Sequence, residues 1–241
     1  MRYAVLGDIH ANLEALNAVC GALEGENIDK YLCVGDLAGY GADPVACIRK
    51  MRQLKAVTVA GNHDWAAADK IDIDDFNDYA RDAVLWTRET ITEADKDFLG
   101  FLELIYRSED FVMVHGTLTA AEDFDYMTDF FKAARTLAAM TVQLCFLGHS
   151  HVAGTFFERK GKIEYDTNSA FKIEPDNKYV INVGSVGQPR DGNPQAAYCI
   201  YDTRSQNIEI RRVSYDVKTA QKKILVAGLP ELLAARLEEG R

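Results

Sequence analysis

The chain has 241 residues, of which 48% are hydrophobic and 27% charged, a composition typical of a globular protein with a sizeable core. Its formal net charge of −10, without any Lys/Arg-rich stretch, argues against a dedicated binder of long nucleic acid, although a small phosphate substrate is compatible with it if metal ions supply positive charge. No apolar run approaches the roughly 20 residues that cross a bilayer, and the first residues are typical of a strand rather than a secretory signal, so we expect a cytoplasmic protein without a membrane partner.

The first part of the chain alternates strands and helices. A helix is expected at residues 12–24, and Asp43 can cap a second helix that begins at Pro44. Strands are expected at residues 2–7, 31–35 and 56–60. This βαβαβ order predicts a largely parallel sheet.

A mostly helical insertion is expected at residues 64–101. It is acidic, with eleven Asp/Glu against four Lys/Arg. Apolar residues recur in it at steps of three, four and three, at Phe76, Tyr79, Ala83 and Trp86. This spacing predicts a helix with one apolar face, which usually packs into the core but could also cover a nucleoside pocket.

The remainder of the chain is rich in predicted strands. A short helix is expected at 128–139, and one or two amphipathic helices at 215–239, broken at Gly228-Leu229-Pro230. The strands are expected at 110–114, 143–147, 152–157, 162–166, 179–183, 196–201 and 207–213. Because no repeat, low-complexity tract or linker interrupts the pattern, we expect residues 1–241 to form a single domain.

All five histidines lie in short polar motifs, most of which directly follow an apolar run. The motifs are Asp8-Ile9-His10, Gly61-Asn62-His63-Asp64, His115-Gly116 and Gly148-His149-Ser150-His151. Ligands bind at the carboxyl ends of strands in open α/β sheets, so we expect these motifs to converge at one edge. Residues i and i+2 of an extended strand point to the same side, so Asp8 with His10, and His149 with His151, are each expected to reach a common point.

Asp36 follows Gly35 at the end of the second predicted strand and is the natural bridging ligand, because one carboxylate can span two cations roughly 3.5–4 Å apart. Mixed imidazole, carboxylate and amide ligands favour Mn, Fe, Zn, Ni or Co over Ca. Each motif alone has an ordinary explanation as a turn or a buried core histidine. Five strand-end motifs that use every histidine of the chain are much harder to obtain by chance, and they predict two divalent transition-metal ions.

Together with Gly35-Asp36, these motifs resemble the full motif set of the calcineurin-like metallophosphoesterases. Gly39-Tyr40-Gly41 and the segment 182–190 are similar to loops of the small prokaryotic phosphodiesterase branch. The resemblance implies an α/β fold of four layers, α/β/β/α, in which two packed mixed sheets are flanked by helices and the site lies at one edge. It also implies two ligand sets that share one carboxylate: Asp8, His10, Asp36 and His151 for one metal, and Asp36, Asn62, His115 and His149 for the other.

The protein serine/threonine phosphatase branch carries a second Asp three residues after the bridging one, followed by Arg. Gly39 and Tyr40 occupy these positions here, which disfavours that branch. His63 is the motif histidine outside both ligand sets, and we expect it to protonate the leaving oxygen or to stabilise its charge, with Asp64 as a candidate for orienting it. Further candidates, for substrate binding, are Asn12, Tyr40, Ser185 and Arg190.

These features predict a metal-dependent phosphoesterase in which a metal-bridging hydroxide attacks a small phosphodiester or a dinucleoside polyphosphate. One alternative is a small-molecule phosphomonoesterase. Another, from a different class, is a non-catalytic scaffold such as the retromer component with this fold, but a scaffold would tolerate lost ligands and this chain keeps all of them. A nuclease is disfavoured because the acidic insertion would repel a long polyanion. The expected partner is therefore a small phosphate ester, and the oligomeric state is left open.

Overall fold

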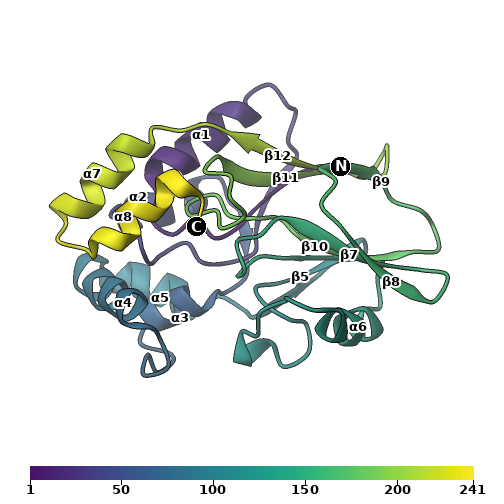
Figure 1. Ribbon diagram of the computed structural model, residues 1–241, viewed down its shortest axis with the longest axis horizontal. Coiled ribbons are helices and arrows are strands. Elements are labelled where there is room, and N and C mark those ends of the chain that lie inside the picture. The colour runs from purple at the N-terminus through teal and green to yellow at the C-terminus, as the bar shows by residue number, and fades with distance from the viewer.

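Two six-stranded sheets pack face to face, with helices on both outer surfaces, in the computed structural model, which describes residues 1–241 (Figure 1). This is the four-layer α/β/β/α arrangement expected from the sequence. Both sheets are mixed: in the first the parallel strands form one half and the antiparallel strands the other, and in the second the parallel strands lie in the middle.

The first sheet has the order β3-β2-β1-β11-β12-β9. Its parallel strands β1, β2 and β3 are connected by α1 (Leu13–Leu23) and α2 (Pro44–Gln53), as the βαβαβ pattern predicts. The strand β11 then pairs antiparallel with β1 and brings the end of the chain into the same sheet. The bounds are β1 (Arg2–Leu6), β2 (Lys30–Cys33), β3 (Val57–Thr58), β9 (Ala170–Lys172), β11 (Ala196–Asp202) and β12 (Asn207–Val213).

The second sheet has the order β4-β5-β6-β10-β7-β8, and β5, β6 and β10 are parallel to one another. Its bounds are β4 (Ile105–Arg107), β5 (Phe111–Val114), β6 (Leu144–Leu147), β7 (Gly154–Arg159), β8 (Lys162–Asp166) and β10 (Lys178–Asn182). The sequence did not predict β4 and β9. Both are three-residue strands, too short to show an alternating pattern.

Strand periodicity divides the core into layers. In β1, Tyr3 and Val5 point into the space between the sheets, whereas Ala4 and Leu6 point to the helices outside. In β6 the large side chain of Phe146 fills the space between the sheets. Alternate residues of one strand therefore serve two separate cores, as a period of two requires.

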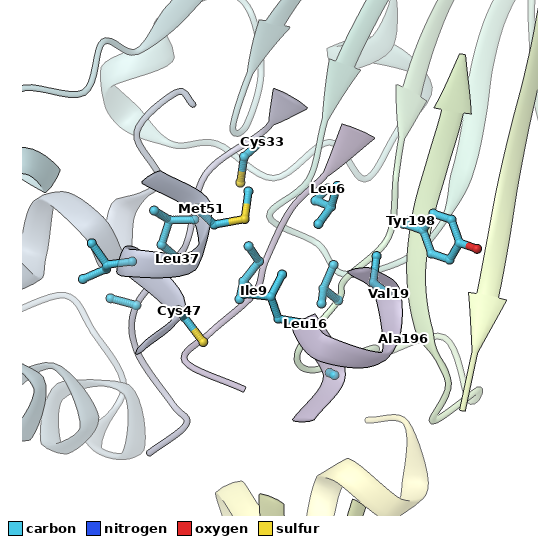
Figure 2. Packing of buried hydrophobic residues seen from close by; sticks show 14 of the residues in the cluster. Leu6, Ile9, Leu16, Val19, Cys33, Leu37, Cys47, Met51, Ala196 and Tyr198 are labelled. Carbon is cyan, nitrogen blue, oxygen red and sulfur yellow. The ribbon is translucent and has the colours of Figure 1, made fainter. Parts of the chain in front are cut away.

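The helices α1 and α2 cover the outer face of the first sheet. Leu16 and Val19 of α1 and Met51 of α2 pack against Leu6 of β1 (Figure 2). On the other side of the molecule, α6 (Phe130–Ala139) covers the outer face of the second sheet. None of the helices combines the length and apolar character needed to cross a bilayer.

The insertion contains α3 (Asn62–Ala67), α4 (Asp78–Thr90) and α5 (Glu93–Gly100), and a short 3-10 helix, η1 (Ala121–Asp123), follows β5. The C-terminal helices α7 (Val217–Val226) and α8 (Glu231–Glu239) pack against α4. These two helices are separated at the Gly228–Pro230 break that the sequence predicts.

The apolar helix face expected at residues 76–86 is confirmed only in part. The Asn77 side chain accepts a hydrogen bond from the Ala80 N–H and caps α4, so Phe76 lies before the helix. Tyr79 is 46% exposed, and the buried face of α4 is formed by Ala80, Ala83, Val84 and Thr87. The buried face of α4 is therefore shifted by one residue from the face that the aromatic residues suggest.

Replacing Phe146 by Ala tests the packing between the sheets. Its fully buried ring makes an edge-to-face contact with Phe111 at 5.6 Å between centroids. We expect Phe146→Ala to lower the free energy of unfolding by about 3–5 kcal/mol, measured by urea denaturation, because the cavity cannot close completely. The control Phe101→Ala removes a ring that is 85% exposed and should change stability by less than about 0.5 kcal/mol. Equal losses would contradict this assignment of the core.

Candidate metal centre

The carboxyl ends of six parallel strands meet at one end of the two sheets. The strands are β1, β2 and β3 of the first sheet and β5, β6 and β10 of the second. The loops after these strands carry all the histidine motifs and Asp36. Backbone hydrogen bonds join the loops, for example from Asp8 N to Gly35 O at 3.0 Å and from Gly148 N to His115 O at 3.0 Å. The convergence expected from the sequence is therefore present.

The site contains two overlapping groups of buried side chains that could hold metal ions. The ligand atoms within each group lie within 4.8 Å of one another. The Oδ2 atom of Asp36 is 3.4 Å from His10 Nε2 and 3.2 Å from His115 Nε2, so one carboxylate oxygen belongs to both groups. The first group is Asp8, His10, Asp36 and His151, and the second is Asp36, His115 and His149. These are the sets implied by the resemblance, apart from Asn62.

Asn62, which the resemblance assigns to the second set, is the first residue of α3. Its side-chain Oδ1 atom is buried and has no hydrogen-bond partner. Leaving a buried amide oxygen without a partner costs about 1–3 kcal/mol. Asn62 lines the same cleft as His149, so a cation held by the second group would satisfy this oxygen.

Backbone carbonyl groups orient three of the imidazoles. The Nδ1 atoms of His10, His115 and His151 lie 3.0, 2.8 and 2.6 Å from the carbonyl oxygens of Ala38, Val34 and Gln188 respectively. A carbonyl only accepts, so each Nδ1 carries a hydrogen and each Nε2 faces the centre. This is the orientation that metal-bound histidines require.

The imidazole nitrogens face one another across the centre in two pairs. His10 Nε2 lies 2.9 Å from His151 Nε2, and His115 Nε2 lies 2.9 Å from His149 Nδ1. Two lone pairs at this distance repel unless a proton or a cation lies between them. The donor set therefore fits divalent transition metals, which bind neutral imidazole and carboxylate together.

Burial controls the protonation of the centre. It raises the pKa of Asp8 to about 7 and lowers the pKa values of His10, His149 and His151 well below the ordinary value. Burial would also lower the pKa of His115, but the adjacent Asp36 carboxylate raises it to about 9. Three of the four imidazoles are thus already in the neutral form that binds a metal, and a cation would displace the proton of the fourth.

Left-handed backbone conformations place the ligands. The φ angles of Asp8, His10, Asp36, His149 and His151 lie between 47° and 68°. The expectation that these pairs extend a strand is therefore wrong: β1 ends at Leu6 and β6 at Leu147, and the motifs curve around the centre. Such conformations cost of order 1 kcal/mol or more each and accumulate at functional sites, where the surrounding structure enforces them.

Two glycines allow the loops to approach the carboxylates. A Cβ atom at Gly61 would collide with the side chain of Asp36, and one at Gly148 would collide with the side chain of Asp8. Only glycine leaves room at both positions, which explains why the motifs contain it.

Asp64 shapes the loop that carries Asp36. Its buried carboxylate accepts hydrogen bonds from the backbone N–H groups of Asp36 (2.8 Å), Leu37 (2.8 Å), Ala38 (3.2 Å) and Gly61 (3.1 Å). All four bonds come from backbone N–H groups and none from the His63 side chain, so Asp64 does not orient His63, contrary to the suggestion from the sequence.

Rings rather than a carboxylate surround His63. Its ring centroid lies 4.5 Å from that of Tyr40, 4.9 Å from that of His10 and 5.2 Å from that of Phe76. The Nδ1 atom is buried without a hydrogen-bond partner, and burial lowers the pKa of His63 to about 4. His63 is therefore a neutral imidazole with an unused ring nitrogen.

Two of the expected substrate-binding residues hold loops instead. Asn12 caps α1 by accepting from Ala15 N at 3.1 Å and donates to Gly187 O at 2.8 Å. Ser185 donates to Asp8 O at 2.7 Å and accepts from Gln188 N at 2.8 Å. Both side chains are buried, and their polar groups are occupied by the backbone.

Tyr40 and Arg190, the other two, lie beside the centre. The guanidinium carbon of Arg190 is 5.5 Å from the centroid of the Tyr40 ring. Arg190 also donates to the side-chain oxygen of Gln188, at 2.8 Å from Nη2. The backbone N–H of Arg190 donates to the carbonyl oxygen of His151 at 3.1 Å, which fixes this arginine next to a candidate ligand.

A cleft of about 320 Å³ opens beside His63 and Asn62. Tyr40 and Phe76 line it, together with four acidic residues, Asp72, Asp75, Glu122 and Asp123. Tyr126, also in its wall, stacks on His149 at 3.9 Å between centroids and was not anticipated. No local motif marks the segment around η1, because only the fold brings it to the centre.

Comparisons with known proteins agree with this geometry. Residues 1–206 match a family model described as a calcineurin-like phosphoesterase superfamily domain. The chain is 40% identical to an uncharacterized protein of Methanocaldococcus jannaschii over 99% of this chain and 98% of that protein. The crystal structure of a metallophosphoesterase from Sphaerobacter thermophilus is 33% identical, with a TM-score of 0.87 over 100% of this chain and 99% of the other. A hypothetical protein from Pyrococcus horikoshii shares the fold, with 17% identity and a TM-score of 0.78 over 100% and 98%.

The shared position of Asp36 leads to a test by metal analysis. Asp36→Asn removes one negative charge from both groups and should lower the metal content at two positions per chain. His10→Ala affects only the first group and should lower it at one. Elemental analysis of proteins dialysed against the same metal buffer measures both, and the wild-type protein should contain up to two ions. Normal metal content in Asp36→Asn would contradict a bridging position.

Proposed function

The chain belongs to the calcineurin-like phosphoesterase superfamily, and from this premise we propose that it hydrolyses small phosphodiesters or dinucleoside polyphosphates with two divalent transition-metal ions. As a member of the superfamily it is a metal-dependent phosphoesterase. The observation that carries the proposal is the contact of a single Asp36 oxygen with imidazole nitrogens of both ligand groups. Such sharing is what a two-metal site requires.

The side chains of the centre would bind the ions in two sets joined by Asp36, with Asn62 in the second. When bound, the ions would supply positive charge for the anionic phosphoryl group and activate a water molecule as the nucleophile. Asp8 and Asp36 are the only carboxylates of the two groups. Two −1 charges against two divalent cations leave a net positive centre, which suits a phosphate anion.

We assign His63 to the leaving oxygen. It lines the cleft beside the ligand Asn62, and its Nδ1 has no partner in the protein. Because burial holds the pKa of His63 at about 4, the neutral ring would act by donating a hydrogen bond to the oxygen as negative charge develops on it. Of the two functions expected for His63, the low pKa favours stabilising the charge of the leaving oxygen over protonating it.

The charges around the cleft support a small substrate. Asp72, Asp75, Glu122 and Asp123 border its walls, so a long polyanion crossing the cleft would meet four negative charges. A substrate with few phosphates, held by the centre itself, avoids this repulsion. We therefore rank long DNA and RNA below small esters.

Substrate profiling tests the proposal. Metal-loaded protein should hydrolyse small phosphodiesters or dinucleoside polyphosphates faster than phosphomonoesters, and activity should disappear after chelation and return with Mn²⁺, Fe²⁺, Zn²⁺, Ni²⁺ or Co²⁺. Product analysis by chromatography measures each substrate. Full activity of metal-stripped protein would overturn the mechanism, and efficient degradation of long nucleic acid without activity on small diesters would overturn the substrate class.

The function of His63 can be tested with His63→Asn. We expect unchanged metal content and thermal stability, with kcat reduced about 10²- to 10³-fold for substrates with alkyl leaving groups. The reduction should be smaller for nitrophenyl esters, whose leaving oxygen needs little stabilisation. Kinetics with both ester types provides the measurement. Loss of metal would instead indicate a ligand, and an equal rate reduction for both leaving groups would exclude a function at the leaving oxygen.

A further inference from the structure

Two arginines near the centre lack a carboxylate partner. Of the fourteen arginines in the chain, eight lie within 4.0 Å of a carboxylate and six do not. Four of these six are exposed, and water solvates their charge. Arg190 and Arg236 are half-buried. A chain with a net charge of −10 has carboxylates in excess, so the lack of a partner at these two positions calls for an explanation.

The C-terminal helix brings Arg236 to the Tyr40 side of the centre. Leu233 and Leu237 of α8 pack in the same apolar cluster as Tyr40. At the end of the helix, Gly192 N donates to Gly240 O at 3.0 Å, which joins α8 to the loop that begins at Arg190. Arg236 lies between Leu233 and Leu237 on α8, and Figure 1 shows the end of this helix beside the central loops.

The two charges are close enough to influence each other. Burial lowers the pKa of Arg236, and repulsion by Arg190 lowers it further. Arg190 lies over the ring of Tyr40, and this ring packs in the same apolar cluster as the helix α8 that carries Arg236.

Half-burying two neighbouring guanidinium groups without a counter-ion is unfavourable for the protein alone. The same arrangement is pre-organised for a multivalent anion, because each guanidinium can donate two parallel hydrogen bonds to phosphate oxygens. The neutral amide oxygen of Gln188 holds Arg190 in place without neutralising it.

We propose that Arg190 and Arg236 form a second phosphate-binding site, which holds a phosphate linked to the one bound at the metal centre. The inference rests on the proposed function and narrows it: substrates with two or more consecutive phosphates, such as dinucleoside polyphosphates, are preferred over simple diesters. Tyr40 separates this site from the acidic cleft, which its ring also lines. A phosphate chain would therefore extend toward the arginines, and the uncharged part of the leaving group toward the cleft.

The test compares Arg236→Ala with a matched control, Arg241→Ala, which removes an equal charge from a 79% exposed side chain at the same end of the chain. Binding of tripolyphosphate and of orthophosphate to the metal-loaded proteins is measured by calorimetry at one fixed free-metal concentration. We expect Arg236→Ala to weaken tripolyphosphate binding about tenfold or more, as for a lost hydrogen bond between charged groups, and to change orthophosphate binding less than twofold. Arg241→Ala should leave both unchanged, and Arg236→Lys should restore part of the affinity.

Several results would overturn the second site. Unchanged tripolyphosphate binding in Arg236→Ala, an equal loss in Arg241→Ala, or a parallel loss of orthophosphate binding would each do so. Thermal melting of the variants checks that α8 stays packed. Failure of the inference is separable from failure of the proposed function. Hydrolysis of phosphate esters with no effect of Arg236→Ala refutes only the second site, whereas selective tripolyphosphate binding in a protein that hydrolyses no ester refutes the function.

Discussion

Three carboxylates, those of Asp8, Asp36 and Asp64, are buried at the end of the two sheets. The groups that compensate their negative charge determine the structure around them. An unpaired charge away from water is too costly to persist. Asp64 is compensated by four backbone N–H groups, which fixes the loop that carries Asp36. The carboxylate of Asp8 accepts a hydrogen bond from the backbone N–H of His149 at 3.0 Å and also faces the imidazole of His151. The carboxylate of Asp36 faces the imidazole of His115. Bound cations would complete the compensation, so folding and metal binding depend on the same groups.

The surroundings of the centre differ in charge from one side to the other. The cleft near His63 is bordered by four acidic residues, whereas the cation of Arg190 lies over the ring of Tyr40, which packs on the helix that carries Arg236. Tyr40 contacts both sides: its ring lies next to His63 and under Arg190, and it packs on α8. An anionic substrate between the acidic cleft and the arginines would be repelled on one side and attracted on the other. This electric field would select one orientation of an asymmetric ester.

The sequence predicted most of the elements and the convergence of the motifs because both follow from local patterns: apolar runs, caps and polar strand ends. It failed where tertiary contacts decide. The left-handed turns at Asp8 and His149 replace the extended geometry expected there. The polar groups of Asn12 and Ser185 are taken by backbone atoms distant in the chain. Tyr126 reaches the centre through folding alone, and no sequence pattern around it marks it.

The pairing of β1 with β11 has a consequence for how the molecule is made. Val5 pairs with Cys199, so the central strand of the first sheet lacks one neighbour until nearly the whole chain has left the ribosome. Contacts between residues so far apart form slowly, because a long loop must close first. The loop after β1 also depends on late residues, since Ser185 holds the carbonyl group of Asp8. A nascent chain therefore exposes one unpaired edge of this apolar strand until β11 has been synthesised, the period in which chaperones protect such edges from aggregation.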